Sequence, residues 1–248
     1  MALHRKFDAM LRLRPDIAVI SECAGPKRLQ ELAGSIGVGA DTVWIGDNRN
    51  KGLAVFAFNG YAVRLAEPFH ATLRHVAPVR VSGPVACNLL AVWAQNGSGG
   101  VNRKHQLGPL RRALTKYKAF LAEQPAIVAG DFNNNVFWHR PGWRINHANA
   151  VASLQKLGLA SAYHVLRGEL QGEETVPTLY WRDRKKDGPG TTSTTFFCQR
   201  PGSARYAIWP SGRSRTGAAR DSAITCRWWS TSAFSGGGVD PSVPPPSA

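Results

Sequence analysis

Short apolar runs and amphipathic segments alternate along most of the chain. Apolar side chains at helical spacing, as in Leu3, Phe7, Met10 and Leu11, predict helices, and unbroken apolar runs of four to eight residues predict buried strands. Helices are predicted over residues 3–13, 27–34, 107–121 and 147–157, strands over 16–23, 43–46, 53–58, 76–81, 88–94, 126–129 and 179–182, and a short element over 160–166. Because helices and strands interleave, the pattern predicts an α/β fold.

The apolar strand Ile127–Ala129 leads directly into a polar turn. Gly130 allows the backbone to turn tightly, and Asp131 and Asn133 follow at the carboxyl end of the strand, where ligands bind in open α/β sheets. A carboxylate two residues from an amide suits a hard metal ion or a nucleophile that attacks a phosphate. The alternative is an ordinary strand-to-turn junction, since Asp and Asn are common turn residues.

A second carboxylate lies at the end of the predicted strand 16–23. Burial of Glu22 at this point is costly unless the side chain is paired or bound to a metal. The alternative for Glu22 is a solvated turn.

Further polar residues follow the predicted strand 88–94 and the turn that begins at Asp131. The candidates for lining a cleft or binding substrate are Asn96, Asn135, His139 and Arg140. The last two belong to an aromatic and basic loop over residues 136–144, which has the composition of a surface that stacks on bases. Packing of this loop on the core is the slightly favoured alternative, and His164 is interpreted as structural.

Composition narrows the class of protein. The chain has 248 residues, 43% of them hydrophobic, and a net charge of +15. Such a charge favours a polyanionic partner, above all nucleic acid, although a solvated basic surface without a specific partner explains it equally well. No apolar run is long enough to span a membrane, and residues 1–14 lack the apolar core of a signal peptide, so a cytoplasmic location is expected. The four cysteines have no metal-binding spacing.

Four segments in consistent order resemble the endonuclease/exonuclease/phosphatase superfamily, which has the deoxyribonuclease I-like fold. They are Pro15–Glu22, Gly52–Phe56, Leu89–Asn96 and Gly130–Asn133, and the resemblance covers residues 1–187. It implies a four-layer sandwich of two mostly antiparallel sheets flanked by helices. It also implies a metal-dependent phosphodiester or phosphoester hydrolase, nuclease-like in its chemistry.

The resemblance further implies a role for each matching residue. Glu22 would bind Mg²⁺, or Mn²⁺ in its place, Asp131 would orient or deprotonate the attacking water, and Asn133 would hold the scissile phosphate or Asp131 itself. DNA, RNA, a phosphoinositide and a small phosphodiester all stay open as substrates, as does the oligomeric state. The rival hypothesis is a basic, non-catalytic module that binds nucleic acid.

The sequence departs from the family pattern at both ends. It begins at the predicted helix 3–13, without the family's first strand and its metal-side Asn, so Met1 is expected to be an internal methionine of a longer chain. After Asp187 it has neither the His-x-Asp-Tyr strand nor the terminal Ser-Asp-His of the family. Residues 188–248 contain no Leu, Lys, Glu, His, Asn or Met. We therefore divide the chain into an enzyme-like domain, 1–187, and a tail, 188–248.

A change of reading frame explains the tail. When the codons permitted for residues 190–199 are regrouped by one base, they allow Tyr-His-Ile-Asp-Tyr-x-Phe-Leu-Pro. The same offset over residues 221–231 allows Leu-Ser-Asp-His-Val-Pro-Leu-Val-Val-Asp, so both missing motifs return in one frame. We therefore expect a frameshifted chain with impaired activity, a largely disordered tail, and open sheet edges where the lost strands belong. The alternative is a genuine Ser/Thr/Gly-rich tail.

Overall fold

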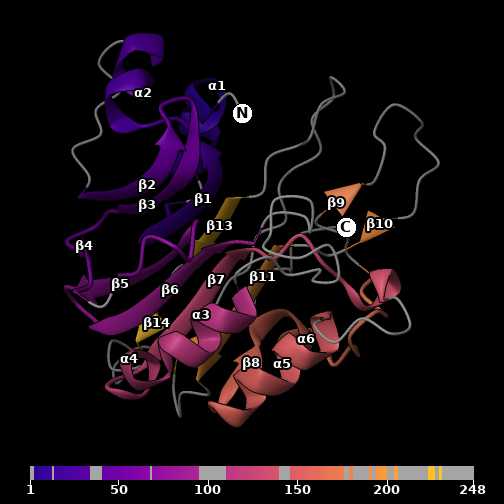
Figure 1. Ribbon diagram of the computed structural model, residues 1–248. Coiled ribbons are helices and arrows are strands. Elements are labelled where there is room, and N and C mark those ends of the chain that lie inside the picture. Colours follow the sequence, from indigo (N-terminus) through magenta and orange to yellow (C-terminus); the bar gives the residue numbers. More distant parts are fainter. Residues whose placement is uncertain are drawn as a thin grey trace, which may run out of the picture.

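Two β-sheets pack face to face, and helices cover their outer faces (Figure 1). The computed structural model describes residues 3–12, 14–33, 41–67, 69–94, 110–139, 146–175, 179–180, 190–191, 194–199, 204–205, 223–226 and 229–230. The predicted α/β sandwich of mostly antiparallel sheets is confirmed.

The first sheet has the strand order β13-β1-β3-β2, and all its pairs are antiparallel. Its strands are β1 (Ile17–Cys23), β2 (Thr42–Asn48), β3 (Lys51–Ala57) and β13 (Ala223–Cys226). Helices α1 (Leu3–Leu11) and α2 (Pro26–Ala33) cover its outer face, where Phe7 and Leu29 pack against Ile20 and Phe56. The helical spacing of the apolar residues in 3–13 and 27–34 therefore marked the faces that are buried.

The second sheet has the order β4-β5-β6-β7-β11-β8, and only the β6–β7 pair is parallel. Its strands are β4 (Ala62–Leu65), β5 (Val76–Ser82), β6 (Cys87–Trp93), β7 (Ala126–Asp131), β8 (Leu159–Ser161) and β11 (Thr194–Gln199). The sequence pattern did not reveal β4, which is short and half-buried. Strand β7 is buried along its whole length, as its unbroken apolar run predicted.

Helices α3 (Leu110–Lys116), α4 (Lys118–Ala122) and α5 (His147–Lys156) cover the outer face of this sheet, and α6 (Ala162–Arg167) follows β8. The single helix predicted over 107–121 is divided at Tyr117, whose buried ring packs in the core while its hydroxyl oxygen accepts a hydrogen bond from the His70 backbone N–H. Residues 107–109 lie outside the described part of the chain.

Two segments of the tail form strands of the sheets: β11 lies between β7 and β8, and β13 lies at the edge of the first sheet beside β1. Strand β11 pairs with β7, with Thr194 opposite Asp131, and β13 pairs with β1, with Ile224 opposite Val19. The expectation of open edges beside β7 and β1 is therefore wrong, because both segments are rich in residues that favour strands, such as Thr, Phe and Ile. The described residues also form two small antiparallel pairs. One joins β9 (Leu179–Tyr180) to β10 (Gly190–Thr191), and the other joins β12 (Ala204–Arg205) to β14 (Trp229–Ser230). The other residues of 188–248 lie outside the described part, and so does the expectation of disorder for them.

Each helix within the described ranges is too short or too polar to cross a bilayer.

Candidate active site

Glu22 lies where β1 leaves its regular pairing with β3. The register shifts between Ile20 and Cys23, and Glu22 itself has a φ of 57°, in the left-handed region that non-glycine residues rarely adopt. A bulge of this kind redirects one side chain away from the alternation of the strand. The Glu22 side chain is 28% exposed, and its Oε1 lies 2.8 Å from Lys51 Nζ.

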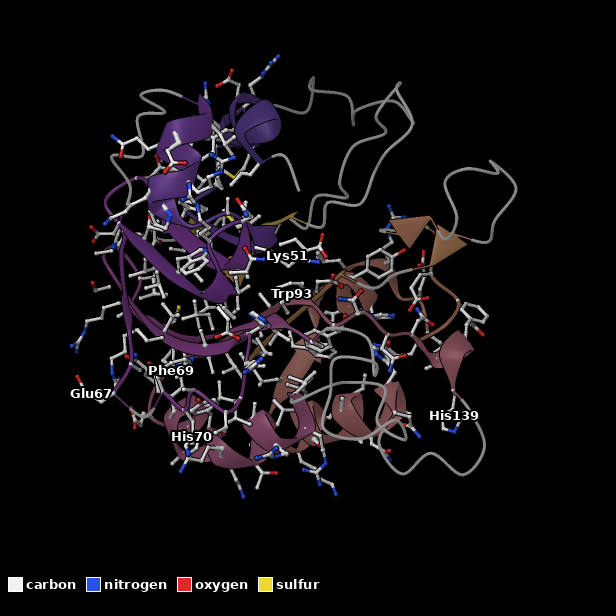
Figure 2. The ribbon with its side chains drawn as sticks, turned by 45° about the horizontal axis from the view of Figure 1, so that its top comes forward. Lys51, Glu67, Phe69, His70, Trp93 and His139 are labelled. Atoms are coloured by element: carbon white, nitrogen blue, oxygen red, sulfur yellow. The ribbon has the colours of Figure 1, made fainter. Side chains whose placement is uncertain are left out.

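Lys51 links Glu22 to the second sheet. Its Nζ lies 5.1 Å from the centroid of the Trp93 ring, at the end of β6 (Figure 2). Trp93 also contacts His75, whose ring centroid is 4.5 Å away and whose carbonyl oxygen accepts the Trp93 backbone N–H at 2.8 Å. Glu22, Lys51, Trp93 and His75 thus form one continuous cluster across the two sheets.

Asp131 ends β7 beside this cluster. It lies opposite Trp93 in the β6–β7 register, and its carbonyl oxygen accepts the Ala94 N–H at 2.8 Å. Asn133 holds the carboxylate: its backbone N–H donates to Oδ1 at 2.9 Å and its Nδ2 donates to Oδ2 at 2.8 Å. The structure therefore brings Asp131 and Asn133 into direct contact, with both carboxylate oxygens oriented.

Backbone strain concentrates in this region. Glu22, His75 and Asn133 are three of the five non-glycine residues with positive φ among those described. Such conformations cost about 1–3 kcal/mol each and persist where the surrounding structure requires them, often at functional sites. Strain at three separate strand ends that meet in one place supports a functional role for the place.

The donors present fit a hard divalent cation. Carboxylate and amide oxygens are the ligands that Mg²⁺ prefers, and Mg²⁺ keeps several waters, so one or two protein carboxylates suffice. Among the described residues, no group of three or more His, Cys, Asp or Glu is arranged to hold an ion. Glu22 is accordingly the candidate ligand, with water completing the shell.

The sequence pattern did not identify His75 and Lys51 as candidate site residues. Burial is the largest cause that lowers the pKa of His75, which favours the neutral imidazole, and its Nδ1 has no hydrogen-bond partner among the described residues. The only signals in the sequence were their positions, Lys51 at the end of a turn-rich segment and His75 directly before an apolar strand. Both positions are common for surface residues, so neither was informative.

Asn135 is buried beneath the loop that follows Asp131, with 1% of its surface exposed. Its Oδ1 accepts the Phe137 N–H at 3.1 Å and caps a 3-10 helix, η1 (Val136–Trp138). Its Nδ2 donates to Glu174 Oε2 at 3.3 Å. Both ends of the Asn135 amide therefore hold the loop in place, and its suggested contact with substrate stays a prediction.

Glu174 is the centre of this supporting network, and its side chain is 3% exposed. Besides Asn135, His164 Nε2 lies 3.1 Å from Glu174 Oε1, and the Gly172 N–H donates to Oε1 at 3.0 Å. Burial alone would raise the pKa of Glu174, but the hydrogen bonds outweigh it and lower the pKa to about 2. His164 is thus structural, as the sequence analysis favoured.

Glu174→Gln is expected to weaken the fold and to reduce its sensitivity to acid. Because the folded pKa lies below the ordinary 4.5, the ionised carboxylate stabilises the protein above pH 4.5, and this contribution disappears as the pH falls towards 2. We expect Glu174→Gln to cost about 2 kcal/mol at pH 7 and much less at pH 2.5. Urea unfolding across this pH range measures it, with the exposed neighbour Glu173→Gln as control. Equal pH profiles for the two variants would contradict the role of Glu174.

Of the remaining candidates, the structure describes His139. His139 is exposed and lies far from Lys51 and Trp93 (Figure 2). Phe137 is 65% exposed, so the expectation that the aromatic loop packs on the core is wrong at this residue. Asn96 and Arg140 lie outside the described residues.

The fold is shared with several solved structures. A 3'-5' exonuclease (NExo) from Neisseria meningitidis superposes with a TM-score of 0.62 and 14% identity, covering 91% of this chain and 95% of that chain. An AP endonuclease from Archaeoglobus fulgidus gives a TM-score of 0.62 and 15% identity over 91% and 93% of the two chains. The human Nocturnin catalytic domain gives 0.53 and 17% over 91% and 84%.

These likenesses assign the chain the fold of the endonuclease/exonuclease/phosphatase superfamily, as the sequence motifs indicated. No family model matches the sequence, and no curated protein matches it either. Two of these neighbours are named as nucleases, and a further structure with the same fold is the 3' phosphatase NExo from Neisseria bound to product DNA hairpin.

Proposed function

We propose that the chain carries the catalytic core of a divalent-metal-dependent phosphodiester hydrolase that acts on nucleic acid. The observation that carries this proposal is the pair of hydrogen bonds from Asn133 to the Asp131 carboxylate. A chain of contacts through Trp93 and Lys51 connects Asp131 to Glu22. The nuclease names of structures with the same fold and the charge of +15 support a polynucleotide as substrate.

Each site residue has a separate role in the proposed reaction. Glu22 would hold the metal ion, which supplies Lewis-acid stabilisation of the phosphoryl charge when bound. Asp131 accepts a proton from, or orients, the attacking water, and Asn133 fixes its carboxylate through two hydrogen bonds. Lys51 adds positive charge between Glu22 and Trp93, where it can attract the phosphate of the substrate.

We further propose that residues 188–248 are read in an offset frame and that this impairs the activity. The offset places an Asp and a His in the segment around β11, which pairs with β7 at Asp131. It also places Ser-Asp-His in the segment around β13, which pairs with β1, the strand of Glu22. The positions of β11 and β13 beside the two carboxylate-bearing strands support this proposal, because acid–base groups there would border the site.

The test compares the chain in its present sequence with a chain whose residues 188–248 are encoded in the offset frame. We expect the offset-frame protein to cleave a labelled oligonucleotide at least about 100-fold faster with Mg²⁺, since a general acid typically contributes 10²-fold or more. Equal rates for two folded proteins would contradict the frame proposal. Absence of cleavage by both would contradict the hydrolase proposal itself.

The rival is a basic module that binds nucleic acid without cleaving it. The charge of +15 favours it, and salt-dependent binding without metal-dependent turnover in either protein would establish it. The proposed location is cytoplasmic, supported by the buried free thiols of Cys23 and Cys87.

A further inference from the structure

A basic cavity of about 390 Å³ lies on the helical face of the six-stranded sheet, between α3 and the segment that leads into β5. Its polar lining residues are His70, Thr72, Arg111, Arg112, Thr115 and Lys116. None of the lining residues is acidic. The cavity therefore gathers three permanent positive charges and several hydrogen-bond donors around one space.

The charges on α3 are unfavourable for the helix itself. Arg111, Arg112 and Lys116 lie within two turns, where cations repel one another, and only Lys116 sits in the last turn, where the helix dipole favours positive charge. Arg111 Nη1 donates to the Thr115 hydroxyl at 2.8 Å, so its neighbour in the cavity is a neutral group. An anion between these side chains would relieve the repulsion.

The two walls of the cavity are fixed to each other. The His70 backbone N–H donates to the Tyr117 hydroxyl at 2.9 Å, which ties the segment before β5 to the end of α3. Leu73 also lines the cavity, and it is buried in one core cluster with Leu110 and Leu114 of α3. His70 Nδ1 also lies 2.8 Å from the Thr72 hydroxyl oxygen. The site is thus shaped by packing before any ligand arrives.

We propose that this cavity binds a phosphate of a nucleic-acid backbone at a position separate from the catalytic site. Guanidinium, ammonium and hydroxyl groups are the side chains that contact backbone phosphates most often, and such contacts set the register of the strand. His70 lies well apart from Lys51 and Trp93, so only a ligand of several nucleotides occupies both places (Figure 2). This inference rests on the proposed function in taking a polynucleotide as the substrate.

The test measures binding of a labelled 20-nucleotide single strand by fluorescence anisotropy in EDTA, which separates binding from turnover. We expect Arg111→Gln/Arg112→Gln to weaken binding about 10-fold at 0.1 M salt and to lower the slope of log K against log[salt] by about 1 to 2. Lys116→Glu, a second variant, is expected to weaken binding as strongly. The matched control is Lys27→Gln/Lys156→Gln, which removes the same charge from exposed positions on α2 and α5.

Equal losses in the control would overturn the inference, because they would reflect net charge alone. An unchanged affinity in both cavity variants would overturn it as well. The outcome is independent of catalysis: a cavity effect without cleavage by any form of the protein would leave the phosphate site standing and reject the hydrolase. Cleavage without a cavity effect would support the hydrolase and reject the phosphate site.

Discussion

Asp131→Asn is expected to lower the rate of metal-dependent phosphodiester cleavage about 10³-fold, because an amide cannot accept a proton from the attacking water. The substitution keeps the size of the side chain and an oxygen for the Asn133 N–H, but it loses the acceptor that faces Asn133 Nδ2. The rate is best measured in the offset-frame protein, where we expect it to be high enough to show such a loss.

The control for this experiment is Asp8→Asn, which removes the same charge from an exposed position on α1. We expect Asp8→Asn to cleave at the rate of the unsubstituted protein. An Asp131→Asn variant that keeps more than about a tenth of the rate, while its thermal unfolding is unchanged, would remove Asp131 from the chemistry.

Gly130→Ala is expected to be the most destabilising single change in the site. Gly130 has a φ of 141°, and a Cβ at this position would lie 1.9 Å from the Val92 carbonyl oxygen of the neighbouring strand β6. Both the backbone strain and the clash must be relieved by moving β7 away from β6, at a cost of about 3–5 kcal/mol. We expect thermal unfolding about 8 °C or more below that of the unsubstituted protein.

Gly60→Ala is the matched control, since Gly60 also has a positive φ, of 80°, but a Cβ there meets no atom within 4 Å. It isolates the cost of backbone strain, which is about 1–2 kcal/mol. If Gly130→Ala were no less stable than Gly60→Ala, the close contact of β6 and β7 at this point would not be required. The position of Asp131, the next residue, depends on that contact.

Sequence alone located the two carboxylates because each follows an unbroken apolar run. Burial of β1 and β7 on both faces makes a polar residue at the strand end conspicuous, so Glu22 and Asp131 were identified as candidates. The hydrogen bonds from Asn133 to Asp131 could also be predicted, since an amide two residues after an Asp can reach the carboxylate.

The rest of the site depends on tertiary structure. Lys51 comes from the hairpin of β2 and β3, and the packing of the two sheets brings it to Trp93. His75 lies directly before β5, and the pairing of β5 with β6 brings it to Trp93. No local pattern distinguishes them from other surface residues. The hydrogen bond from the His70 backbone N–H to the Tyr117 hydroxyl is a similar case, because the two residues are distant in sequence.

The most direct test of a metal-dependent hydrolase centred on Glu22 and Asp131 is the Mg²⁺ dependence of oligonucleotide cleavage, measured for the offset-frame protein and its Glu22→Gln variant. We predict that EDTA abolishes cleavage and that Glu22→Gln raises the Mg²⁺ concentration for half-maximal rate about 10-fold or more. The lost Glu22–Lys51 pair is partly exposed and contributes little to stability, so the variant is expected to fold. Cleavage that persists in EDTA, or the same Mg²⁺ dependence in both proteins, would contradict this assignment.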